Sequence, residues 1–287
     1  MRVSSRTTDL PVLLPARSVA ATCEWGSADA VRFLGSAKWL MILIAALFCS
    51  AAVAAADVQP RPGILETVLK WTPLIWSGFL FNLLVSAASM ALGTAVGFAL
   101  GIGQISLHKP VRQLSWGVTQ FFRNAPWLVL LFFAMFLLPF ELHLGPLVVP
   151  LPAWLKAVVG LALPVMANVA EIVRGGIGSI PSGQWESAES LAFSRMQILW
   201  RIVIPQAFKQ MIPPWMNLYA ILTMATTLIS VVGIQDSMTL TRAALVAEAR
   251  TDLYLPFYFL LLLMFFAYCY PIARITLMLE RRFAVAA

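Results

Sequence analysis

The sequence predicts an all-α membrane protein with a five-helix core and one additional transmembrane helix near its N-terminus. Of the 287 residues, 60% are hydrophobic and only 11% are charged, and the mean hydropathy is +0.84. A soluble domain is usually about 45–50% apolar and about a quarter charged. Because so few charges cannot cover a soluble surface, we expect lipid to solvate much of the chain.

Six apolar stretches approach or exceed the roughly 20 residues that a membrane-spanning helix needs. They are Trp39–Ala56, Trp76–Gly103, Ala125–Phe140, Leu151–Ile172, Met211–Ile234 and Leu255–Met278. The third is short, and the residues before it, 111–123, mix apolar and polar side chains as an interfacial helix does.

The first stretch has two interpretations. It ends in FCSAAVAAADV, whose small residues are also typical of a secretory signal cleaved after Ala56. The 38 residues before it are longer than the usual charged region of a signal, so a retained helix is favoured unless translation starts at Met41. We therefore expect a tail over 1–38, an extra span over 39–56 and a membrane domain over 72–284.

Lysine and arginine are concentrated on one side of these six spans. With both termini on the same side, that side carries 15 of the 20 lysines and arginines. Such an excess marks the cytoplasmic side of a membrane protein. The pattern predicts that both termini, including the tail, are cytoplasmic.

Several functional classes are excluded by the residues present. The net charge is +7, but the basic residues are spread along the chain without an aromatic–basic patch, which excludes nucleic-acid binding. Cys23, Cys49 and Cys269 have no paired spacing, and His108 and His143 are the only histidines, so neither a disulfide framework nor a metal cluster is expected. An intramembrane hydrolase is excluded because no nucleophile and base form a recognisable pair.

Three glycines recur every four residues in the second predicted span. Gly93, Gly97 and Gly101 would line one face of the helix with hydrogen atoms. Such a face allows another helix to approach closely, although glycine is also simply frequent in membrane helices. The spacing favours close helix packing.

A polar segment, Gln184–Gln206, interrupts the apolar pattern. Helical spacing predicts two short amphipathic helices joined near Ala192–Ser194, with Glu186 in the first turn of the first helix, where a carboxylate favours the macrodipole. Ser194-x-x-Gln197 matches a capping box that begins the second helix, and Pro205 is expected to end it. The apolar side of that helix is predicted to consist of Met196, Leu199, Trp200 and Val203. The segment is either a solvated surface loop or a docking element for a partner.

This segment resembles the cytoplasmic loop of ABC importer permeases, written E-A-A-x3-G-x9-I-x-L-P. The matching positions are Glu186, Ser187, Ala188, Ala192, Ile202, Ile204 and Pro205. FFRNAPWLVLLFF (Phe121–Phe133) and ANVAEIVRGGI (Ala167–Ile177) are similar to motifs of the polar-amino-acid branch of that family. The resemblance covers about residues 76–282 and implies a five-helix ABC importer permease core whose coupling loop, residues 181–209, contacts an ATPase.

The resemblance also implies function and partners. The chain is expected to be the permease subunit of an ATP-driven importer that moves polar amino acids or related small solutes across a bacterial inner membrane. The implied partners are a dimer of ATPase subunits, a second permease subunit, an extracytoplasmic solute-binding protein and the lipid bilayer. No G-x-x-x-x-G-K-[ST] loop occurs, so this chain is expected to bind no cofactor, and ATP and magnesium belong to the ATPase.

The sequence departs from the family pattern at four places. Ser187 replaces the first alanine of the motif. Ala192 replaces the family glycine, so either the turn there is right-handed or the loop carries strain. Residues 224–228 read MATTL where the family has K-D-T-S-L, and Asn168 replaces a tyrosine. The latter two changes leave the class of solute open.

Polar side chains within the spans mark the expected solute path, because lipid makes unpaired polar groups costly. They are Asn168, Glu171, Thr223, Thr226, Thr227 and Ser230. Alternatively, Glu171 forms an ion pair with Arg174 on its own helix, and the threonines bond to backbone carbonyls. The alternative function is a secondary transporter driven by an ion gradient, but such proteins hold acidic sites near the midplane, whereas Glu171 is predicted near a helix end.

Overall fold

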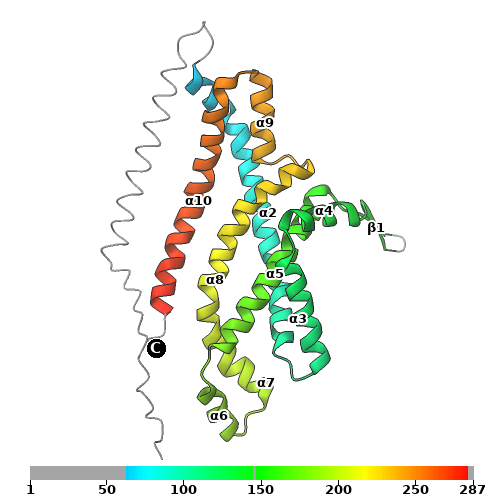
Figure 1. Ribbon diagram of the computed structural model, residues 1–287, viewed down its shortest axis with the longest axis vertical. Helices are drawn as coiled ribbons and strands as arrows, with labels where there is room; N and C mark the ends of the chain where they lie inside the picture. The colour runs from blue at the N-terminus through cyan, green and yellow to red at the C-terminus, as the bar shows by residue number, and fades with distance from the viewer. Residues whose placement is uncertain (1–62, 145–146, 284–287) are drawn as a thin grey trace, which may run out of the picture. The chain divides into compact units, whose positions relative to one another are not determined.

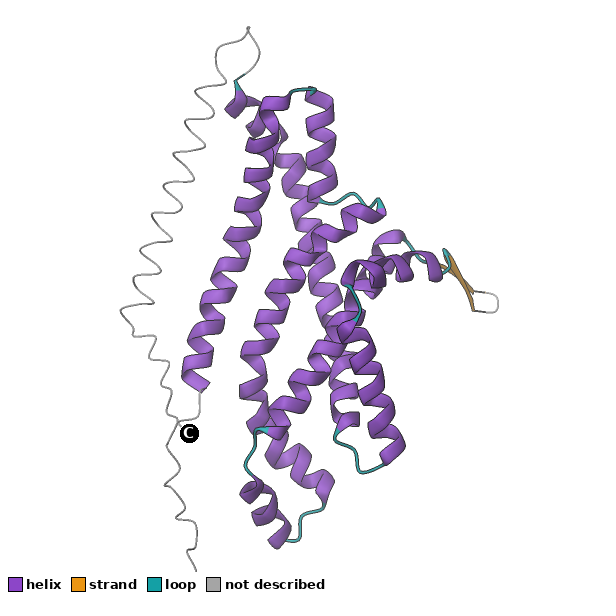
Figure 2. Cartoon of the chain, in the orientation of Figure 1, coloured by secondary structure: helices purple, strands orange, loops and turns teal. Residues whose placement is uncertain are grey.

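The computed structural model describes residues 63–144 and 147–283, so the predicted tail 1–38 and extra span 39–56 lie outside the described residues. The described part is helical except for an antiparallel hairpin, β1 (Glu141–Leu144) and β2 (Leu147–Pro150). Figure 2 shows this hairpin in orange beside the purple helices. The predicted all-α membrane class is confirmed, with a short hairpin added between the third and fourth predicted spans.

Four helical stretches of the described residues are long and apolar enough to cross a membrane. They are α2 (Ile64–Gln104), α5 (Ala153–Gly178), the run Arg195–Val232 that contains α8 (Ile204–Ala225), and the run Thr251–Phe283 that contains α10 (Tyr254–Phe283). A fifth crossing results if α3 (Lys109–Asn124) and α4 (Trp127–Leu137), which are bent by 106°, count as one span. With this pair counted as one span, the described residues contain the predicted five helices of the core.

The boundaries of two predicted elements differ from the structure. The α2 helix begins at Ile64 rather than at Trp76, because Pro73 is accommodated inside the helix instead of ending it. The break between α3 and α4 lies at Pro126, and Ala125 before it takes the extended conformation that a following proline favours. The α3 helix packs against α2 and α5.

The glycine face of α2 packs directly on α5, as Figure 1 shows for the two helices. A β-carbon added at Gly93, Gly97 or Gly101 would lie within 2.6 Å of an atom of Val165, Met166 or Val173 respectively. Real β-carbons do not approach other atoms so closely. The prediction of close helix packing is confirmed, and α5 is the partner.

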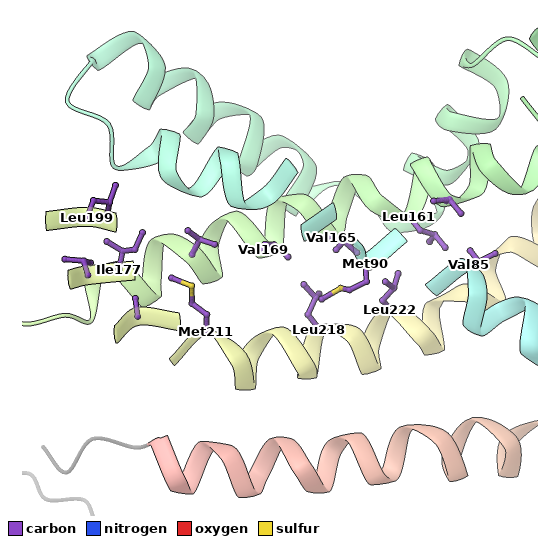
Figure 3. Close-up of a cluster of buried hydrophobic side chains, with 14 of the residues drawn as sticks. Val85, Met90, Leu161, Val165, Val169, Ile177, Leu199, Met211, Leu218 and Leu222 are labelled. Carbon is purple, nitrogen blue, oxygen red and sulfur yellow. The ribbon is translucent and has the colours of Figure 1, made fainter. Parts of the chain in front are cut away.

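The main core lies among α2, α5, α8 and the start of the run Arg195–Val232. Figure 3 shows its side chains, which come from all four regions: Val85, Met90, Leu161, Val165, Val169, Ile177, Leu199, Met211, Leu218 and Leu222. Because α8 and the coupling loop share this core with α5, a displacement of one is transmitted to the others through close-packed side chains.

One helix, α9 (Ser237–Glu248), was not expected from the sequence. It begins at Asp236, whose carboxylate accepts a hydrogen bond from the Thr239 amide at 2.9 Å. Glu248 at its end accepts hydrogen bonds from Trp71 Nε1 and Lys70 Nζ of α2, and these bonds hold the pKa of Glu248 below its usual range. Figure 1 places α9 at the opposite end of α8 from the coupling loop.

Candidate coupling loop and solute cavity

The coupling loop forms a helix, a turn and a second helix that leads into the membrane. The first helix is α6 (Ser182–Ser190), and the second begins with α7 (Arg195–Ile198), continues as a π-helical turn, η1 (Leu199–Val203), and runs directly into α8. The predicted helix–turn–helix is confirmed, but Pro205 does not end the second helix. It lies inside the continuous helical run, where η1 passes into α8.

The capping box at the start of α7 is confirmed. Ser194 Oγ accepts from the Gln197 amide at 3.4 Å, and Gln197 Oε1 accepts from the Ser194 amide at 2.9 Å. Because this reciprocal pair satisfies two amides at the helix start, it fixes where the second helix begins.

The buried side of the second helix differs from the predicted one. Ile198, Leu199 and Val203 are buried in the main core, whereas Met196 and Trp200 are exposed. The predicted place of Glu186 was also wrong, because α6 already begins at Ser182 and Glu186 therefore lies in the second turn.

The residues that match the family loop are divided between surface and core. Glu186, Ser187 and Pro205 are exposed, Ile202 and Ile204 are half-buried, and Ala188 is buried. The loop therefore exposes its polar side while Ala188 anchors it to the main core.

Ala192, at the position of the family glycine, has a φ angle of 57°. This is the left-handed region, which the β-carbon of alanine disfavours by about 1–2 kcal/mol. Of the two alternatives left by the sequence, the structure therefore supports a strained turn.

Replacing Ala192 with glycine is expected to raise the free energy of unfolding by about 1 kcal/mol, because glycine removes that strain. The measurement is thermal unfolding of the full chain in detergent. The matched control is Ala243→Gly, an exposed alanine inside α9, where glycine should destabilise by a similar amount. Equal destabilisation by both substitutions would show that the turn at Ala192 is unstrained.

A cavity of about 550 Å³ lies between α3, α5 and α8. Its polar lining residues are Arg123, Asn168, Glu171, Ser179, Gln210 and Asn217. Two of the predicted path residues, Asn168 and Glu171, thus share one cavity. Asn168 donates from Nδ2 to the carbonyl of Pro164 at 2.8 Å, which orients its side chain.

Glu171 is held by two arginines. Its Oε2 lies 2.6 Å from Arg174 Nη2 and 3.3 Å from Arg123 Nη1. The Arg174 contact confirms the alternative prediction of an ion pair within α5. The Arg123 contact links α5 to α3. Gln120 adds a long hydrogen bond at 3.5 Å. The cavity therefore presents a carboxylate and a guanidinium side by side.

The threonines do not line this cavity. Thr223, Thr226 and Thr227 donate to the carbonyls of Tyr219, Thr223 and Met224 respectively, at 2.7–3.0 Å. Ser230 does the same with Thr227 at 2.8 Å. These residues therefore follow the alternative prediction, because their hydroxyl groups donate hydrogen bonds to backbone carbonyls of their own helical run.

Thr226 also belongs to a buried polar cluster that sequence reasoning missed. Asn82 of α2 donates from Nδ2 to Thr226 Oγ1 at 3.1 Å and to Asp236 Oδ2 at 3.3 Å, and its Oδ1 accepts from the Ser237 amide. Its only sequence signal was an asparagine and an aspartate flanked by apolar runs. This cluster fixes the end of the run Arg195–Val232 against α2.

This arrangement of helices can be compared with those of known protein families. Residues 93–285 match the family model described as "Binding-protein-dependent transport system inner membrane component". The chain belongs to this family. As a member, it is a multi-pass inner membrane protein and the permease component of a transport system.

Individual relatives agree with the family. The chain is 31% identical over 208 residues to the inner membrane amino-acid ABC transporter permease YhdY of Escherichia coli, covering 72% of this chain and 56% of YhdY. It therefore spans little more than half the length of that relative. It is 30% identical over 212 residues to the probable amino-acid ABC transporter permease YckA of Bacillus subtilis, covering 74% of this chain and 90% of YckA.

A solved structure shows the same fold. A chain from the crystal structure of an amino acid ABC transporter with histidines superimposes with a TM-score of 0.65 at 26% identity, covering 75% of this chain and 96% of that one. The fold described above is therefore shared with a chain of an amino acid ABC transporter.

Proposed function

We propose that this chain is the permease subunit of an ATP-driven importer of polar amino acids or related small solutes. The observation that carries the proposal is the continuity of the helical run Arg195–Val232, which joins the exposed coupling loop to a wall of the cavity. A partner that moved the loop would shift Gln210 and Asn217 relative to Glu171 on α5. Hydrolysis in the partner would thereby change access to the cavity.

The proposed solute site is the cavity around Asn168 and Glu171. A zwitterionic amino acid carries an ammonium and a carboxylate, which complement Glu171 and the neighbouring Arg123. The names of the relatives, which refer to amino-acid transport, support this class of solute.

The proposed partners are those of the family. A dimer of ATPase subunits would dock on the coupling loop, with ATP and magnesium bound there and not by this chain. A second permease subunit would complete the membrane part, and an extracytoplasmic binding protein would deliver the solute.

The test is uptake by proteoliposomes that contain the complex co-purified with the tagged full chain. We expect accumulation of a labelled polar amino acid that needs ATP on the coupling-loop side and persists when ion gradients are collapsed. The chain alone is expected to hydrolyse no ATP. Uptake by the chain alone, driven by an ion gradient, would instead establish the secondary transporter.

The proposed orientation puts the coupling loop and the C-terminus in the cytoplasm, because most lysines and arginines lie on that side. A reporter fused after residue 287 should then give a cytoplasmic signal, and one inserted at residues 145–146 an extracytoplasmic signal. A reversed pair of signals would contradict the proposal, since the loop would be out of reach of ATP.

A further inference from the structure

A second, larger hollow of about 910 Å³ lies where the coupling loop meets the ends of α2 and α5. Its walls combine apolar and basic side chains. The apolar ones include Ile102, Ile177, Ile180, Trp185 and Leu199, and the basic ones are His108, Arg174 and Arg195. No carboxylate is among the residues that line it. The hollow therefore offers positive charge beside an apolar surface.

The three basic residues come from three different parts of the chain. His108 precedes α3, Arg174 lies near the end of α5, and Arg195 opens α7. A solvated cytoplasmic surface would leave such side chains pointing apart, whereas here the fold brings them around one hollow. An adjoining hollow of about 360 Å³, lined by Arg112, Trp116 and again Arg174, extends the basic region toward α3.

Arg195 has no ion pair with a carboxylate among the described residues. Its guanidinium carbon lies 5.7 Å from the centre of the Trp185 ring, a cation–π contact that orients the group. Arg174, by contrast, is already paired with Glu171. An oriented and unpaired guanidinium is well suited to bind a phosphate through two parallel hydrogen bonds.

Gln104 lines both hollows and contributes an unmatched acceptor. Its Nε2 donates to Thr119 Oγ1 at 2.8 Å, while its Oε1 has no hydrogen-bond partner in the described part of the chain. A buried carbonyl oxygen without a donor is unfavourable. A ligand that brings hydroxyl groups together with a phosphate would suit this wall best.

We propose that this hollow binds the phosphate headgroup of an anionic phospholipid, with Arg195 as its main contact. The shared chemistry is a phosphate, which either a lipid or a free ion can supply. The apolar wall favours the lipid, because glycerol and acyl carbons would be buried against it. Basic pockets between helices on the cytoplasmic side are the expected place for such headgroups, because the cytoplasmic leaflet is rich in anionic lipid.

Phosphatidylglycerol is the appropriate probe, because it carries both a phosphate and headgroup hydroxyls. Native mass spectrometry of the detergent-solubilised full chain would count bound phosphatidylglycerol during a titration, with phosphatidylcholine as the reference lipid. Binding in detergent does not depend on membrane orientation or on transport, so its failure is separable from failure of the proposed function.

Arg195→Gln is expected to weaken phosphatidylglycerol binding about fivefold, because that is the change in affinity that one cation near an anionic lipid surface contributes. Arg195→Lys, which keeps the charge, should weaken it less. The matched control is Arg201→Gln, which removes an exposed arginine of the same helical run that does not line the hollow, and should leave binding unchanged.

Three results would overturn the proposal. The first is equal binding of phosphatidylglycerol by the Arg195→Gln and Arg201→Gln chains. The second is displacement of the bound lipid by inorganic phosphate at equal concentration, which would make a free ion the ligand. The third is that Arg195→Gln leaves lipid binding intact but weakens association with the ATPase partner, which would assign these cations to a protein contact.

Discussion

Replacing Gly97 with alanine is expected to lower the free energy of unfolding by about 1–3 kcal/mol, the usual cost of forcing an extra carbon into a packed core. The new β-carbon would lie 2.5 Å from the carbonyl oxygen of Met166 and 2.7 Å from Cβ of Val169. The first of these atoms belongs to the backbone of α5 and cannot turn aside, so the two helices must separate. Thermal unfolding of the full chain in detergent would measure the loss.

The control for this effect is Gly117→Ala. Gly117 lies in α3, and nothing is within 4 Å of a β-carbon added there. Alanine favours a helix over glycine by up to about 1 kcal/mol, so this variant should be neutral or more stable. If the Gly97→Ala and Gly117→Ala chains unfold at the same temperature, α2 and α5 do not pack as described.

Replacing Glu186 with lysine is expected to leave the chain in the membrane at normal abundance but to abolish transport. Glu186 is exposed on α6, while Ala188 of the same helix is buried against the core. Because Glu186 lies in the second turn, the helix dipole adds little, and the change should shift stability by only about ±0.5 kcal/mol. Its effect should fall instead on the contact with the proposed ATPase.

Reversal of a charge at a complementary contact costs several kcal/mol, so association with the ATPase should fall at least about tenfold. Co-purification and substrate uptake would measure this loss. Glu189→Lys is the matched control, because Glu189 is exposed on the same helix but lies outside the family pattern. Normal uptake by the Glu186→Lys complex would falsify the assignment of α6 as the coupling contact.

The sequence predicted what local patterns encode. The apolar spans after residue 62, the glycine face of α2 and the capping box at Ser194 each depend on residues within a few turns of one another, and all three are present. The tight turn at Ala192 was predicted in position, although its left-handed conformation was one of two alternatives.

The errors arose where distant segments or irregular helix geometry decide the outcome. The contact of Arg123 with Glu171 joins residues 48 positions apart, so no local spacing indicates it. The buried side of the second coupling helix was predicted for an ordinary α-helix of 3.6 residues per turn, but the helix contains the π-helical turn η1. Leu199 and Val203 are buried as predicted, Ile198 is buried with them, and Met196 and Trp200 are exposed.

The same π-helical turn has a mechanical consequence for the run Arg195–Val232. At 1.5 Å per residue, a helix of 38 residues is about 57 Å long, so this run connects the coupling loop with the cavity. A helix transmits a displacement along its whole length only if it is rigid, and helices bend at π turns and at internal prolines. The π turn is η1, near the start of the run, and the internal prolines are Pro213 and Pro214, at its middle. A push on the coupling loop is therefore expected to reach the cavity as a tilt about these joints rather than as a rigid shift of the whole helix.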